Sequence, residues 1–167
     1  MRNRQKGFSL IELLVVVAII LIIAAIAIPN LLRSKMAANE SSAVGSLRTL
    51  NTAEVTYAAA YNDTGYSADL PSLGGDPATC ATTATVAQAC LVDNTLALST
   101  AAATAHSGYF FTYNLNGVAG GINTAYTLLA SPANAGTTGQ RFFFTDESGV
   151  IRYGLTGAAD TTSSAIQ

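Results

Sequence analysis

The stretch GFSLIELLVVVAIILIIAAIAIPN, residues 7–30, decides how this chain folds. Residues 13–28 are all apolar, and a helix over residues 8–28 is about 31 Å long at about 1.5 Å per residue, close to a bilayer core of about 30 Å. One carboxylate, Glu12, lies near the start of this run. A charged side chain costs about 2.5–3.5 kcal/mol at the centre of an inserted helix. A plain anchor needs no such group, so the sequence predicts a specific partner for Glu12.

The charges around the apolar run predict its orientation in a membrane. Arg2, Arg4 and Lys6 precede the run, and positive residues hold that end in the cytoplasm, so the remainder is expected on the exported side. The whole chain is nearly neutral, with 8 Lys and Arg against 10 Asp and Glu. No Lys or Arg occurs between Arg48 and Arg141, and this acidic character counts against a nucleic-acid partner.

A cleaved secretory signal is an alternative interpretation of the same run. Residues 25–27, Ala-Ile-Ala, supply a small-x-small cleavage site after an apolar stretch with a basic start. Two observations count against it, because Glu12 lies inside the apolar region and the helical pattern continues past the proposed cut.

The continuation over residues 30–61 predicts an amphipathic helix fused to the membrane helix. Apolar residues recur at steps of three, four and seven and predict a buried face: Met36, Ala43, Leu47, Leu50, Ala53, Tyr57 and Tyr61. Polar residues predict the exposed face: Arg33, Lys35, Asn39, Glu40, Ser41, Arg48 and Asn51. Residues 8–61 would form one rod of about 80 Å, with a kink or local melting at Pro29. The turn formers of residues 62–65 end the helix.

Residues 62–167 predict a globular head of α+β class. A short helix is expected within residues 86–98. Alternating or aromatic runs separated by turn residues then predict an antiparallel sheet of about four strands, at residues 109–115, 125–130, 140–145 and 150–153. The apolar face of this sheet is expected to pack on the amphipathic half of the helix, with Tyr57 and Tyr61 in the contact.

The two cysteines of the chain, Cys80 and Cys90, both fall on the exported side. An oxidising compartment favours a disulfide between them, and the alternative is two buried free thiols.

The sequence carries no pattern typical of an enzyme. His106 is the single histidine, so no histidine pair can bind a metal. The glycines of residues 117–121 lack the lysine and following helix of a phosphate-binding loop. We therefore expect no catalytic residue and no cofactor.

The leader ending in Lys6-Gly7, the run from Phe8 to Glu12 and the long apolar helix resemble the class III signal of type IV prepilins and type II secretion pseudopilins. The resemblance covers residues 1 to about 66, and the head matches only in general layout. It implies that a prepilin peptidase cuts between Gly7 and Phe8 and that the new amino terminus is N-methylated.

The resemblance also implies roles in assembly. The amine of Phe8 would pair with Glu12 of a neighbouring subunit in an apolar bundle, and Pro29 matches the proline that interrupts the helix in that family. Asp146 and Glu147 are calcium candidates by likeness to a C-terminal loop of major pseudopilins, although their spacing favours a plain hairpin turn.

The implied organisation is a leader at residues 1–7, a transmembrane and polymerisation helix at 8–29, an amphipathic helix at 30–61 and a head at 62–167. The function predicted is that of a structural subunit in a helical homopolymer. The precursor would lie in the inner membrane, and the pilus assembly machinery would build an extracellular filament from it. The alternatives are the major pseudopilin of a type II secretion system and an adhesive or DNA-binding minor pilin.

Overall fold

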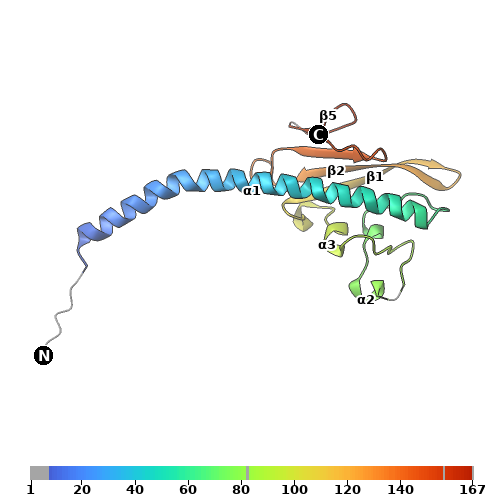
Figure 1. Cartoon of the computed structure of the whole chain (residues 1–167), viewed down its shortest axis with the longest axis horizontal. Coiled ribbons are helices and arrows are strands. Elements are labelled where there is room, and N and C mark those ends of the chain that lie inside the picture. The colour runs from blue at the N-terminus through green and yellow to red at the C-terminus, as the bar shows by residue number, and fades with distance from the viewer. Residues whose placement is uncertain (1–7, 82, 156, 167) are drawn as a thin grey trace. The chain divides into compact units, whose positions relative to one another are not determined.

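The structure is a computed structural model that describes residues 8–81, 83–155 and 157–166 (Figure 1). It divides into two compact units, Met1–Lys35 and Met36–Gln167. Helix α1, Leu10–Ala60, contributes to both units. The second unit also contains the sheet and the short helices, which together form the head.

Helix α1 confirms the long helix expected from the sequence. It runs without interruption through Pro29, so the local melting expected there is not seen. Proline removes one backbone donor from a helix interior. One residue further on, the side-chain amide of Asn30 donates to the carbonyl oxygen of Ile26 at 3.1 Å, which adds a donor to the turn that Pro29 weakens.

The sheet is a five-stranded antiparallel meander in the order β1-β2-β3-β4-β5. The four predicted strands are confirmed, and the fifth, of two residues, was not predicted. The strands are β1 Tyr109–Ala119, β2 Ile122–Pro132, β3 Phe142–Asp146, β4 Arg152–Gly154 and β5 Ser164–Ala165. Gly120 and Gly121, both with positive φ, form the two-residue turn between β1 and β2, a geometry that favours glycine. The β1–β2 ladder shifts register at Gly117.

Short helices lie in the segment between α1 and β1. They are η1 Pro71–Leu73, α2 Pro77–Cys80, α3 Asn94–Ala97 and η2 Ala102–Thr104. The helix predicted within residues 86–98 was too long, since only α3 forms, with the Asp93 side chain accepting from the amide of Thr95 at 3.0 Å. Residues 89–91 instead donate backbone hydrogen bonds to the carbonyls of residues 72–74. A backbone group paired in this way is no longer available to a helix.

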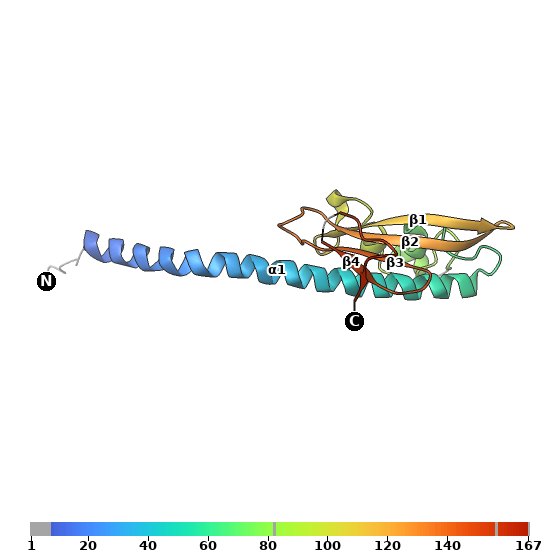
Figure 2. The same cartoon turned by 90° about the horizontal axis from the view of Figure 1, so that it is seen from above.

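The head core lies between α1 and one face of the sheet (Figure 2). Burial alternates with period two in β2, where Tyr126, Leu128 and Ala130 face the core. Leu47, Leu50 and Tyr57 of α1 cover them. Tyr57 is buried and Tyr61 packs against the core, as predicted, and the Tyr57 hydroxyl donates to the carbonyl oxygen of Val86 at 2.7 Å.

Glu40 corrects the predicted exposed face of α1, because its residue surface is only 7% exposed. Its carboxylate accepts from the amides of Gln140 and Arg141 at 2.9 and 3.2 Å and from Nε of Arg141 at 2.7 Å. The adjacent Asn39 donates to the carbonyl oxygen of Thr138 at 2.8 Å. Two neighbouring helical residues thus fix the loop that leads into β3.

The charge on Glu40 is stabilised where it lies. Burial raises the pKa of this carboxyl, but the hydrogen bonds from Gln140 and Arg141 and the positive charge of Arg141 outweigh burial, so its pKa is lowered. The guanidinium of Arg141 also lies 5.7 Å from the ring centre of Phe143 and 5.6 Å from that of Tyr153. Arg141 therefore joins the helix to two strands.

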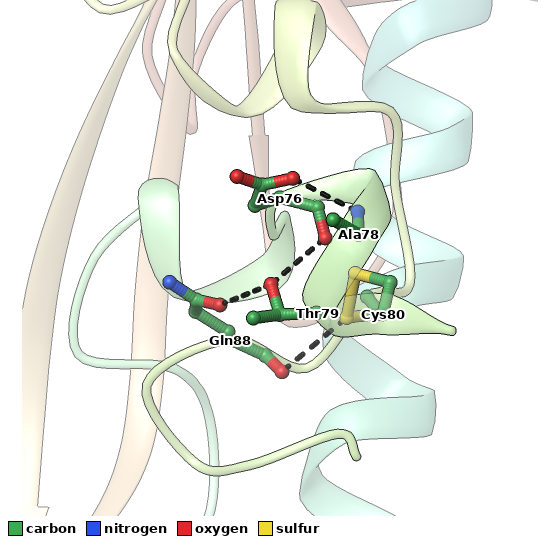
Figure 3. The surroundings of a disulfide bond; sticks show 6 residues. Asp76, Ala78, Thr79, Cys80 and Gln88 are labelled. Carbon is green, nitrogen blue, oxygen red and sulfur yellow. Dashed lines mark hydrogen bonds between the residues drawn. A yellow bond between two sulfur atoms is a disulfide. The ribbon is translucent and has the colours of Figure 1, made fainter. Parts of the chain in front are cut away.

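The predicted disulfide between Cys80 and Cys90 is confirmed (Figure 3). The Asp76 side chain accepts from the amide of Ala78 at 2.9 Å and so caps α2, which ends at Cys80. Gly75 lies directly against the bridge, because a Cβ atom there would be 2.6 Å from Sγ of Cys80 and 2.8 Å from Sγ of Cys90. No side chain fits at position 75 while the disulfide keeps its place.

We predict that Gly75→Ala impairs the disulfide and destabilises the head. The loop length corresponds to about 2.5–3 kcal/mol in the chain-entropy model, and losing that constraint sets the scale of the effect. The measurements are thiol titration and thermal unfolding of the full chain in detergent micelles. Gly45→Ala is the matched control, since its Cβ meets nothing within 4 Å and alanine stabilises a helix interior by about 0.5–1 kcal/mol over glycine. A fully oxidised Gly75→Ala protein with wild-type stability would contradict the prediction.

We predict that Glu40→Gln lowers stability by about 1–3 kcal/mol at neutral pH, the lower part of the range reflecting the partly exposed Arg141. Because the pKa of Glu40 is lowered on folding, its contribution is present above the unfolded value of about 4.3 and is lost as pH falls through the folded value. Unfolding of wild type and variant across this range checks the sign. A difference that grows towards acid would be the contrary result.

Candidate functional site

The first turn of α1 carries the candidate assembly residues. Ser9 precedes the first helical residue, Leu10, and the Ser9 amide donates to Oε2 of Glu12 at 2.9 Å. Leu13 donates its amide to the Ser9 carbonyl at 3.2 Å. This is the glutamate half of a capping box, in which a Glu at the third helical position satisfies a backbone donor before the helix. Glu12 therefore has a partner within its own chain.

The second oxygen of the Glu12 carboxylate remains available. Within residues 8–81, 83–155 and 157–166, Oε1 of Glu12 has no hydrogen-bond partner. A carboxylate at this position also interacts favourably with the helix dipole, which is positive at the N-terminus. One oxygen can thus hold the helix start while the other accepts from a second group.

An apolar surface follows this turn on every side of the helix. Large apolar side chains from Phe8, 77% exposed, to Leu32, 49% exposed, contact little of the chain itself. Between Lys6 and Arg33 Glu12 is the only charged residue. Among the described helices, α1 contains a window of mean hydropathy 3.3, none of it buried, and is long and apolar enough to cross a membrane. A surface of this kind marks contact with lipid or with other apolar helices.

Two further residues of the predicted site are Gly7 and Pro29. Gly7, on the amino side of the predicted cut, lies outside the described residues. Pro29 lies within α1 and is exposed.

The two calcium candidates lie in the turn from β3 to β4. Asp146 accepts from the amide of Ser148 at 3.0 Å and from its hydroxyl, and Glu147 is exposed. Within the described ranges, no group of three His, Cys, Asp or Glu residues is arranged to hold a metal ion. Calcium binding there stays an untested prediction.

The N-terminal segment matches known proteins. Residues 2–28 match the family model described as the prokaryotic N-terminal methylation motif. The chain is 48% identical over 54 residues to the type IV major pilin protein PilA of Myxococcus xanthus, a match covering 32% of this chain and 24% of that protein. It is 61% identical over 41 residues to the type IV wide pilus major component PilA4 of Thermus thermophilus, covering 25% of this chain and 30% of that protein.

The N-terminal segment of the chain is thus similar to that of type IV major pilins. It spans less than a third of the length of these curated relatives. No solved structure matches the chain significantly. The fold, a long apolar helix with an antiparallel sheet, is nevertheless α+β and pilin-like.

The N-terminal segment contains one contact that was not predicted from the sequence, the hydrogen bond from the Ser9 amide to Glu12. The signal was present, because Ser-x-x-Glu before an apolar run is the sequence signature of a capping box. From the sequence we predicted that Glu12 pairs with the Phe8 amine of a neighbouring subunit, and we did not consider a contact within the same chain. The contact gives the carboxylate a structural role before any assembly takes place.

Proposed function

We propose that this chain is a structural subunit of a type IV pilus filament, with no catalytic role. The observation that carries the proposal is the exposed apolar part of α1 with a single carboxylate in its first turn. The likeness of this part to major pilins supports it. The match supports this structural role for the N-terminal segment, and we propose it for the whole chain.

The exposed apolar surface is covered in two successive ways. In the precursor, lipid of the inner membrane surrounds residues 8–29, and the basic residues before them stay in the cytoplasm. In the filament, the same residues of neighbouring subunits surround each other. Because both surroundings are apolar, the transfer leaves little net hydrophobic driving force, and assembly needs a directional contact and the pilus machinery.

Glu12 supplies that directional contact. Cleavage between Gly7 and Phe8 creates a positively charged amine on Phe8, which N-methylation retains. Oε1 of Glu12 accepts from the Phe8 amine of a neighbouring subunit, while Oε2 keeps the Ser9 amide of its own chain. In an apolar bundle the attraction between these charges is much stronger than in water. The desolvation of Glu12 is thereby offset at each subunit.

Pro29 is proposed to act in the same transition. Its missing amide leaves one carbonyl of the preceding turn without a helical partner, so this turn is the weakest of the apolar part. Local loss of helix there would let the polymerisation helix adapt to neighbours in the filament. Residues 43–57 would keep their helical form because the head core holds their buried face.

Deletion of the gene, followed by imaging of cells and assay of protein export, tests the proposed function. Loss of long surface fibres with export intact is the expected result. Loss of export with fibres intact would replace this proposal with the type II secretion pseudopilin, which shares the leader and the helix in kind.

We predict that the mature amino terminus is N-methylated Phe8, cut by a prepilin peptidase. Removal of Arg2, Arg4 and Lys6 takes away three positive charges and changes the net charge from −2 to −5. The charges that anchor the precursor in the cytoplasm are thus released on processing. Intact-mass analysis of sheared filaments measures the terminus. A terminus at Ile28 would restore the secretory-signal interpretation.

We predict that Glu12→Ala leaves membrane insertion and cleavage largely intact but strongly impairs filament assembly. Insertion becomes easier because a group costing up to about 2.5–3.5 kcal/mol is removed. Assembly suffers because breaking a buried ion pair costs about 3–5 kcal/mol and the loss recurs at every subunit. The measurement compares cleaved chain in the membrane with chain in sheared filaments.

Glu12→Gln is the matched variant for this experiment. A glutamine oxygen still accepts from the Ser9 amide, so the capping contact is kept while the charge is lost. Equal assembly defects in the Ala and Gln variants assign the effect to charge pairing between subunits. Wild-type filament yield from Glu12→Gln would show that capping, and not charge, is what Glu12 supplies.

A further inference from the structure

A second carboxylate of α1, Glu54, is enclosed in the head core with none of its surface exposed. Both of its oxygens contact one residue: Oε2 accepts from the Ser67 amide at 2.9 Å, and Oε1 lies 2.6 Å from the Ser67 hydroxyl oxygen. Within the described ranges, no Lys or Arg forms an ion pair with it. A buried charge without an opposite charge is strongly unfavourable.

The hydrogen-bond arrangement around Ser67 indicates which form of Glu54 is present. Oγ of Ser67 lies 2.6 Å from Oε1 of Glu54 and 3.0 Å from the carbonyl oxygen of Asp69. Both neighbours are acceptors when Glu54 is ionised, and a hydroxyl has one hydrogen to donate. One of the two hydrogen bonds, to Glu54 or to Asp69, cannot then form. If Glu54 carries a proton on Oε1, it donates to Ser67, and Ser67 donates to Asp69, so each oxygen is satisfied.

The titratable groups that interact with Glu54 are three tyrosines, and within the described ranges none of these groups carries a positive charge. They are Tyr57 on α1, Tyr113 on β1 and Tyr126 on β2. Tyr113 donates its hydroxyl proton to the carbonyl oxygen of Ser67 at 2.7 Å. Burial raises the pKa of Glu54, and the hydrogen bonds from Ser67 and Tyr113 only partly counteract it.

We propose that the folded head holds Glu54 as a neutral carboxylic acid. The proton on its carboxyl group joins α1 to Ser67, and the carbonyl oxygen of Ser67 in turn accepts from Tyr113 of β1. The head then takes up a proton when it folds. Acid stabilises the contact, and rising pH weakens it by placing an unpaired charge in the core. Glu54 and Ser67 thus form a pH-sensitive connection at the point where the chain leaves α1.

Proton linkage determines whether the stability of the head rises or falls with pH. The folded form holds the proton to higher pH than the unfolded form, so the contribution of Glu54 is complete below the unfolded value of about 4.3 and is lost as pH rises through the folded value. Between these two values, each pH unit lowers the ratio of folded to unfolded chain about tenfold, or about 1.4 kcal/mol. Glu40, with its lowered pKa, has the opposite sign.

The test is unfolding of the full chain in detergent micelles between about pH 4 and pH 8, for wild type and Glu54→Gln. The glutamine amide donates to Ser67 as the protonated acid does. We expect equal stabilities near pH 4 and a folded-to-unfolded ratio at least about tenfold higher in Glu54→Gln near pH 8. Glu147→Gln, which removes an exposed carboxylate of the head, is the control and should follow wild type. If the stability of wild type instead rises relative to that of Glu54→Gln as the pH increases, the proposal is wrong, because the anion would then be the stabilised form.

Infrared spectroscopy of the folded chain gives a measurement that does not depend on unfolding. At about pH 5.5, well above the ordinary value for Glu, wild type should show the carbonyl band of a protonated carboxyl group, and isotope labelling of glutamate should shift it. The band should be missing from Glu54→Gln and present in Glu147→Gln. Its absence from folded wild type at this pH would also overturn the proposal, even if Glu54→Gln fails to fold.

Discussion

One helix has to satisfy two different surroundings along its length, and the rest of the structure depends on how α1 does so. Its first part, through Leu32, presents apolar side chains all round, so only lipid or other apolar helices can cover it. Its later part buries one face and exposes the other. The backbone is helical in both parts, but tertiary packing stabilises the helix only in the second.

The elements with a strong period could be predicted from the sequence. The steps of three and four in α1 and the alternation in β2 identify the faces that meet in the core. A period identifies a face but not a partner. Glu40 was placed outside because it is charged, and its partner Arg141 is about a hundred residues away along the chain. Glu54 lies next to the predicted apolar face, but no period in the sequence indicates its partner, and only the fold brings Ser67 to it.

Short elements could not be predicted for a different reason. Strand β5, Ser164–Ala165, has no alternation to detect, and it forms because β4 offers it free backbone groups. Helix α3 stops short of its predicted length because residues 89–91 find backbone partners in an earlier loop. Tertiary hydrogen bonds decide such segments, and a single sequence does not display them.

The two buried carboxylates of α1 show how little local sequence fixes the state of a charge. Glu40 and Glu54 both face the head core from the same helix. Arg141 and two backbone amides surround the first, whereas a serine and several tyrosines surround the second. The packed strand or loop, and not the helix itself, determines which form of each acid is favoured.

The irregular pairing of β1 affects whether a strand of another chain can pair with it. β1 is at one edge of the sheet, and an edge strand with a regular row of unpaired donors and acceptors invites pairing with another chain. Near its start, the amide of Phe111 is already bonded to the carbonyl oxygen of Ser99 at 2.7 Å. Further along, the register shifts at Gly117 interrupt the regular spacing, which makes strand addition unfavourable. In the proposed filament, where many heads would lie close together, ordered assembly through helices would in this way be kept separate from amyloid-like aggregation through sheet edges.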